Sequence, residues 1–230
     1  SYAPLELRQR KHLTLRESFA GFRGLVANRN AWLIFLAQGG FVGAILPFPG
    51  LWRPPYLRQR FELPATAASA VCSVMIVCWA TASPLFGYFS DRIGRRKPLY
   101  LGGAIGSALG WTTMFYAPLS LAGFVGAAAL TSVACGAVII GFAYAKESVP
   151  VRFLGTITGA INVGNMIGPT FLQPAIGSVL DSRWSGATAG GVHTFSVAAY
   201  HAAFTMIVVW SVLSCLFIAS TRDTHCRPAA

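Results

Sequence analysis

Charged residues, and acidic ones above all, are scarce in this chain. Asp and Glu together number 7 among 230 residues, and charged residues make up only 11% of the sequence, less than half the usual share. The chain is 54% hydrophobic, and so few charged residues are not enough to give it a surface that faces water. The same composition excludes a disordered chain, a disulfide-stapled secreted module and a collagen-like repeat. The composition therefore predicts a protein whose solvent is the lipid bilayer.

Patterns typical of metal binding, nucleic-acid binding and catalysis are also missing. The 5 cysteines form no CxxC pair and lie mostly within apolar runs, as small packing residues do. The net charge of +11 comes from basic residues placed between apolar runs, where they orient a chain against the membrane. These runs contain no paired carboxylates, no HExxH motif and no Ser or Cys with a plausible buried base. We therefore expect no metal, no cofactor, no nucleic-acid partner and no enzymatic activity.

Apolar runs long enough to cross the roughly 30 Å hydrocarbon core as helices divide the chain. The stretch from 98 to 145 carries no charge and is too long for one crossing, and Pro118 is the best break near its middle. The predicted spans are residues 31–52, 64–90, 98–117, 120–145, 153–180 and 195–219. We expect an all-α membrane protein with six transmembrane helices over residues 31–220 and a cytoplasmic tail at 221–230.

The distribution of Lys and Arg predicts the orientation of these spans. The connections on the side of both termini carry 14 basic residues, and those on the other side carry 4. Basic residues near span ends stay cytoplasmic, so we expect a protein of the bacterial inner (plasma) membrane with both termini on the cytoplasmic side. In segment 1–30, Thr14 and Glu17 have capping-box spacing, which predicts a helix at the membrane interface or, equally, a linker helix packed under the bundle. This segment has no continuous apolar core of a signal peptide, and the missing initiator Met suggests a processed or partial chain.

The connection between the second and third predicted spans reads GYFSDRIGRRK, from Gly87 to Lys97. Gly87 lets a helix end approach a neighbour closely, and Gly94 can adopt the positive φ of a tight reversal. Asp91 is the one acid in this connection, able to pair with its basic residues or with a helix N-terminus. The turn is held in the cytoplasm by the basic residues Arg92, Arg95, Arg96 and Lys97. A charge pairing of this kind can be made and broken.

This connection resembles the signature of the major facilitator superfamily, which is Gly, three residues, Asp, Arg or Lys, one residue, Gly and then basic residues. The next connection on the basic side also resembles the superfamily in its acid, proline and basic residue, here Glu147, Pro150 and Arg152. The superfamily has twelve spans in two halves with the substrate between them, and this chain resembles a C-terminal half. The resemblance implies an N-terminal six-helix half as partner and alternating-access transport of a small solute. We expect Asp91 and Arg95 to act in a conformational latch formed by Gly87, Asp91, Arg92, Gly94, Arg95 and Arg96.

Polar residues within the predicted spans are candidates for a substrate path. On the fifth span they recur at spacings of 4, 3, 4 and 4, which places them on one helical face: Thr158, Asn162, Asn165, Pro169 and Gln173. Unpartnered amides in hydrocarbon cost several kcal/mol, so this face contacts substrate and water or, equally well, hydrogen-bonds a neighbouring helix. In the superfamily the first and fourth spans line the central cavity, which adds Gln38 of the first span.

Titratable groups for ion coupling are missing from the span interiors. No Asp, Glu, Lys or Arg lies there, so a proton-coupling acid is expected in the other half. His201 near a span end joins the candidate path, although a lone His there is more often structural. The rival interpretation is a membrane interaction or scaffold protein derived from a transporter half.

Overall fold

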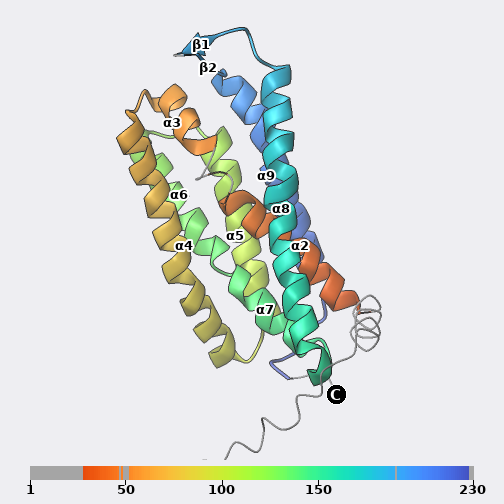
Figure 1. Cartoon of the computed structure of the whole chain (residues 1–230). Helices are drawn as coiled ribbons and strands as arrows, with labels where there is room; N and C mark the ends of the chain where they lie inside the picture. Colours follow the sequence, from red (N-terminus) through yellow and green to blue (C-terminus); the bar gives the residue numbers. More distant parts are fainter. Residues whose placement is uncertain (1–27, 47, 49–51, 190, 228–230) are drawn as a thin grey trace, which may run out of the picture.

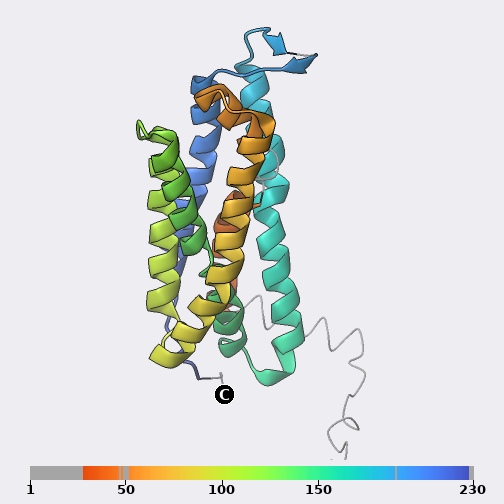
Figure 2. The same cartoon turned by 90° about the vertical axis from the view of Figure 1, so that its left-hand side faces the viewer.

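A computed structural model describes residues 28–46, 48, 52–189 and 191–227, which are mostly helical (Figure 1). The helices are α2 (Arg29–Ile45), α3 (Arg53–Phe61), α4 (Ala65–Ile93), α5 (Lys97–Tyr116), α6 (Leu121–Cys135), α7 (Val138–Glu147), the 3-10 turn η3 (Val151–Phe153), α8 (Leu154–Ser182) and α9 (Val197–Ala219). Strands β1 (Thr188–Ala189) and β2 (Val192–His193) form an antiparallel hairpin. The long helices run along a common axis, with α3 and the hairpin at one end and the C-terminus at the other (Figures 1 and 2). The expected helix around Thr14 lies outside the described residues.

Four of the predicted helices, at 64–90, 98–117, 153–180 and 195–219, occur within a few residues of their expected bounds, as α4, α5, α8 and α9. Local signals in the sequence explain their ends. Gly94 ends α4 in the left-handed region at φ 69°, and its N–H bonds to the carbonyls of Ser90 and Asp91. Pro118 lies between α5 and α6, and Ser120 caps α6 by accepting from the Gly123 N–H. The positive φ of Gly94 and the break at Pro118 are confirmed.

The helices at the positions predicted for 31–52 and 120–145 are shorter and less regular than expected. The first ends at Ile45 as α2, two residues before Pro47 in the sequence, which has no N–H for a further helical hydrogen bond. The second is divided into α6 and α7 around Gly136, which packs against α4: a Cβ there would lie 2.9 Å from the Ala82 Cβ and 3.0 Å from the Ser83 nitrogen. Composition does not reveal a break made by this close tertiary contact.

The closest helix contact joins α2 to α8 through glycines on both helices. A Cβ added to Gly43 would lie 2.7 Å from the Gly168 Cα, and one added to Gly164 would lie 2.6 Å from the Phe35 carbonyl oxygen. Only glycine permits backbones to approach this closely, as small residues do between helices in membranes. Helix α2 is thereby held in the interior of the described part of the chain.

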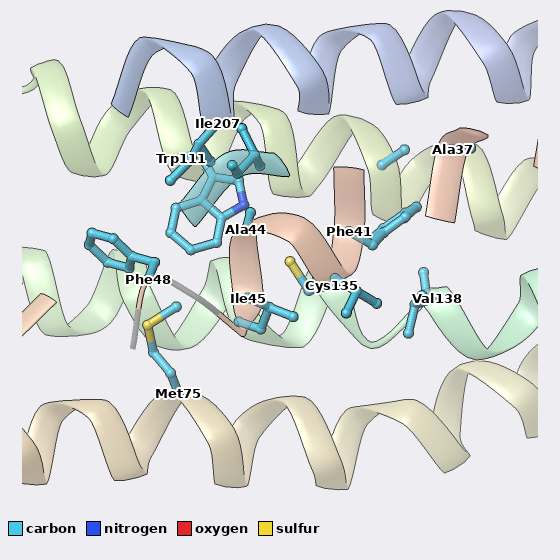
Figure 3. Packing of buried hydrophobic residues seen from close by; sticks show 14 of the residues in the cluster. Ala37, Phe41, Ala44, Ile45, Phe48, Met75, Trp111, Cys135, Val138 and Ile207 are labelled. Carbon is cyan, nitrogen blue, oxygen red and sulfur yellow. The ribbon is translucent and has the colours of Figure 1, made fainter. Parts of the chain in front are cut away.

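The apolar core is built around α2. Figure 3 shows Phe41, Ala44 and Ile45 of this helix among buried side chains contributed by α4, α5, α6, α7 and α9. Phe48, just beyond α2, packs edge-on against Trp111 at a centroid distance of 5.2 Å. This core fixes how the helix ends, and therefore the connections between them, are placed.

The outer surface of the bundle is strongly apolar. Val77 of α4, Leu109 of α5, Leu130 of α6 and Val163 of α8 are each more than half exposed. Among the described residues, three helices or helix pairs are long and apolar enough to cross a membrane, namely Ala65–Ile93, Leu121–Glu147 and Val197–Ala219. Exposed apolar helices of this length are expected in lipid, not in water.

Candidate functional site

The short turn between α4 and α5 brings four charged groups to one end of the bundle. Gly94 reverses the chain between the two helices. Arg95, Arg96 and Lys97 therefore follow Asp91 within six residues, at the same end of the bundle. Arg96 points inward and its side chain is only 8% exposed. Arg95 stays at the surface with its side chain 54% exposed. Two adjacent arginines therefore have different environments.

Arg96 is the centre of a charge network. Its Nη1 contacts the Asp91 Oδ1 at 2.5 Å and donates to the Ser90 hydroxyl at 3.1 Å. Its Nη2 and Nε both donate to the Glu147 Oε1, at 2.6 and 2.9 Å. Burial by itself lowers the pKa of Arg96, but hydrogen bonds and charge from Glu147 and Asp91 outweigh it and raise the pKa. The guanidinium thus stays charged and joins α4 and α5 to the end of α7.

The segment after α9 also contacts this network, which the sequence pattern does not predict. Asp223 accepts from the Arg95 Nε at 3.1 Å and from the Arg96 backbone N–H at 3.3 Å. Thr224 donates to the second oxygen of Glu147 at 2.6 Å. Lys97 donates to the carbonyls of Ala219, the last residue of α9, at 2.7 Å and of Thr221, just beyond it, at 2.8 Å, where the helix dipole favours a cation.

These contacts correct the expected latch in detail. The sequence offers Asp91 as the one acid within the turn, whereas Glu147 and Asp223 also pair with the turn from elsewhere in the chain. Arg95 and Asp91 have different partners, because the inward position beside Asp91 is taken by Arg96. Burial raises the pKa of Asp223, but backbone and Arg95 hydrogen bonds lower it by more, leaving the pKa below its ordinary value.

The other residues predicted for the latch, and Pro150 and Arg152 of the next connection, have their described contacts outside this network. Arg92 is exposed and donates to the Tyr88 hydroxyl at 3.2 Å. Arg152 is exposed and lies 4.8 Å over the Phe153 ring, while Pro150 precedes η3. A Cβ on Gly87 would meet only the Ile139 Cγ2, at 3.9 Å. Within the described chain, no neighbour approaches Gly87 closely enough to require glycine.

Gln38 lies in the core and hydrogen-bonds two other helices. It is 0% exposed, accepts from the Tyr100 hydroxyl at 3.0 Å and donates to the Val138 carbonyl at 3.3 Å. This geometry joins α2 to α5 and α7 near the break at Gly136. The polar residues of the spans could contact substrate or hydrogen-bond a neighbouring helix, and the contacts of Gln38 fit the second role.

The polar face of α8 runs from the buried to the exposed side of the helix. Thr158 is half-buried and donates to the Leu154 carbonyl of its own helix at 2.7 Å. Asn162 is exposed and Gln173 is half-buried. Asn165 is 8% exposed, and its Oδ1 has no hydrogen-bond partner among the described residues. A buried amide oxygen without a partner is costly, so Asn165 is the most unusual polar group of this face.

His201 lies apart from that face. Its Nε2 is 3.4 Å from the Tyr56 hydroxyl of α3, and its backbone carbonyl accepts from Tyr116 of α5 at 3.2 Å. The structure therefore places His201 with α3 and α5, at the end of the bundle away from Asp91. Its observed contacts fit the structural role that a lone histidine near a span end usually has.

A family comparison decides how the Asp91 turn is classified. Residues 30–228 match the sequence model of the Major Facilitator Superfamily, which is most of the chain. The chain belongs to the major facilitator superfamily. It is therefore a multi-pass membrane protein of a transporter family.

Curated relatives in this superfamily include lysosomal dipeptide transporters. The chain is 29% identical over 156 residues to the lysosomal dipeptide transporter MFSD1 of Danio rerio, covering 66% of this chain and 32% of that protein. The corresponding protein of Gallus gallus is 28% identical over 156 residues, covering 66% and 34%. The chain thus spans about a third of the length of these relatives.

Solved superfamily structures share the fold. The inward-open xylose transporter XylE from E. coli superposes with a TM-score of 0.58 at 13% identity, covering 88% of this chain and 48% of that one. The proton:xylose symporter XylE bound to 6-bromo-6-deoxy-D-glucose gives a TM-score of 0.58 at 14% identity, covering 89% and 45%. At these identities the likeness concerns the fold alone, and the chain spans about half of either structure.

Within the superfamily signature, sequence reasoning finds the turn but misses part of its surroundings. Sequence reasoning does not identify Asp223 and Thr224, because they follow the last apolar run and belong to the predicted tail. An available signal is that Asp223 is one of only 7 acids in the chain, next to a predicted helix end on the basic side. A rare acid near a basic cluster on the same membrane side is a candidate partner for it.

Proposed function

We propose that the chain is one six-helix half of a secondary active transporter that moves a small solute by alternating access. The six spans would be α2, α4, α5, α6 with α7, α8 and α9. Coverage of about half of the similar solved structures supports this division. The missing partner would be an N-terminal six-helix half, in the same polypeptide or in a separate chain.

The observation that carries the proposal is the buried position of Arg96 between Asp91 and Glu147. A buried guanidinium is stable only with its partners in place, so the charges at this end of the bundle have one defined arrangement. Asp91 is the most exposed of the ion-paired side chains, at 68%, ahead of Arg95 at 54%, and it is therefore the one that a second half reaches most easily. Its contacts would stabilise one access state, and their loss would let the halves rock.

The surface available to a second half includes α4 and α8. Phe89 of α4 is 50% exposed, and Met166 and Val163 of α8 are 50% and 57% exposed. Gly87 is open on the same helix as Phe89, so its lack of a side chain would serve contact with a partner outside the described chain. Asn162 and Asn165 on α8 would then lie at or near the boundary between the halves, which makes them the preferred path residues. Thr158 and Gln173 extend that path, whereas Gln38 and His201 would support the helices around it.

The membrane and the solute are also part of the proposal. Both termini would face the cytoplasm of a bacterial inner membrane, as the 14 basic residues on that side indicate. The named relatives are lysosomal, and the named structures are of xylose transporters, so candidate solutes are small polar organic molecules. Ion symport would use an acid of the other half, because the span interiors of this chain carry none.

The decisive experiment measures uptake by the intact transporter carrying Asp91→Asn. We expect this substitution to abolish uptake of a dipeptide or D-xylose while insertion and abundance stay normal. Lys146→Gln is the matched control, because Lys146 is an exposed basic residue at the same end that has no ion-pair partner among the described residues. Unchanged uptake in the Asp91 variant would remove the latch from the mechanism. A chain that never pairs with a second half and instead co-purifies with a soluble protein would favour the scaffold interpretation.

A further inference from the structure

A pocket of about 440 Å³ opens at the end of the bundle away from Asp91. It lies between α3, strand β2 and the start of α9, the region seen at the end opposite the C-terminus in Figures 1 and 2. Volumes of this size suit small molecules. The pocket shares no lining residue with the Arg96 network or with the polar face of α8.

Two opposite charges line this pocket and have no partner within the described chain. Arg58 and Glu62 are exposed and make no ion pair with each other, although they lie about one helical turn apart along the chain. The neighbouring Arg60 behaves differently, because its guanidinium donates to the carbonyls of Met114 at 2.9 Å and Ala117 at 2.8 Å. Arg60 is therefore structural, while Arg58 and Glu62 are free to bind a ligand.

The backbone at Glu62 adds to this observation. Glu62 ends α3 in the left-handed region at φ 54°, where glycine is the ordinary residue. A non-glycine residue held there costs of the order of 1 kcal/mol, and such residues cluster at functional sites. A carboxylate at this helix end lies next to the negative end of the α3 dipole, which is unfavourable unless a cation neutralises it.

A tyrosine hydroxyl adds to the polar lining. Tyr200 is only 2% exposed, lines the pocket and has no hydrogen-bond partner for its hydroxyl among the residues that the structure describes. Its hydroxyl is not among the enclosed, unpartnered polar atoms of the described residues, so it reaches the open space of the pocket and can donate to a ligand there. Leu63, Val192 and Phe195 add apolar surface to a wall that also carries the polar side chains of Gln59, His193 and Thr194.

The geometry points to a binding site for an apolar α-amino acid in this pocket. The ligand's carboxylate pairs with Arg58, its ammonium group pairs with Glu62, and its side chain lies against Leu63, Val192 and Phe195. A simple anion is repelled by Glu62 and a simple cation by Arg58, whereas a zwitterion with adjacent charges satisfies both. The Tyr200 hydroxyl supplies a further hydrogen bond to the ligand's carboxylate. This site requires neither the latch nor a second half of the transporter.

Isothermal titration of the purified chain in detergent tests the site with three probes. L-leucine carries both charges, leucinamide lacks the carboxylate, and N-acetyl-leucine lacks the ammonium group. We expect leucine to bind and each analogue to bind about 10-fold more weakly, as expected for the loss of a partly exposed charged hydrogen bond. No leucine binding by the folded chain at millimolar concentration would overturn the proposal.

Substitutions assign each charge to its partner. Arg58→Gln should weaken leucine binding about 10-fold and remove the preference for leucine over leucinamide, while the preference over N-acetyl-leucine persists. Glu62→Gln should have the reciprocal effect. Arg183→Gln is the matched control, an exposed arginine at the same end that does not line the pocket, and it should keep wild-type affinity. Because Arg58 and Glu62 are exposed, these variants are expected to fold, and unchanged analogue preferences in both would contradict the site.

Discussion

Helices α4 and α8 have 29 residues each but are held by the rest of the chain in different ways. Eight residues of α8 are buried, including the glycines that touch the backbone of α2. Only four residues of α4 are buried, namely Ala68, Met75, Ala82 and Ser90. Helix α8 is thus more firmly packed than α4. The Arg96 network lies at the C-terminal end of α4, where a change of charge acts on the less firmly packed helix.

The largest effect is expected from breaking the contact between α2 and α8. A Cβ at Gly168 would press against the backbone of Gly39 and Gly43, so Gly168→Ala should lower the free energy of unfolding by about 3 kcal/mol. A Cβ at Gly155 of the same helix meets nothing within 4 Å, so Gly155→Ala should be neutral or stabilise by up to about 1 kcal/mol. Circular dichroism during unfolding in mixed micelles measures both. Equal effects would mean that the glycine contact does not hold α8.

The second test breaks the charge network at the end of α4. Arg96→Gln leaves Glu147, whose side chain is only 13% exposed, without its cation, and should cost about 2 kcal/mol. Hydrogen exchange should accelerate at the ends of α4 and α5 that flank the turn and stay unchanged in α8. Lys146→Gln, an exposed change nearby, should stay within about 0.5 kcal/mol of wild type. Accelerated exchange throughout α8 would contradict the difference between the two helices.

The sequence predicts the features that depend on one residue's own chemistry. The reversal at Gly94 follows from its tolerance of positive φ, and the break at Pro118 from its missing N–H. The signature turn is recognisable because its residues are contiguous. Each of these features is local, so the order of residues along the chain is enough to predict it.

Features that depend on residues far apart in the chain could not be predicted in the same way. The break at Gly136 arises where α6 meets α4, and the role of Gln38 depends on Tyr100 and Val138 of two other helices. Helix α3 is short and polar, so no search for long apolar runs detects it. Asp223 reaches Arg95 across 128 positions of sequence.

The smallest expected effect concerns the contact between the tail and the α4 end. The pKa of Asp223 is lowered from its ordinary 3.8, so its ionised form stabilises the fold above that pH. This contribution should disappear as the pH falls below 3.8 and through the lower pKa of the folded state. Asp223→Asn should therefore have a lower free energy of unfolding than wild type at pH 6, by about 1 kcal/mol or less because Arg95 is exposed. The curves of stability against pH of the two proteins should converge in acid. Every other acid is the same in both proteins, so the difference between the curves isolates Asp223. A gap that persists at low pH would show that the tail is held by its backbone contacts and not by this charge.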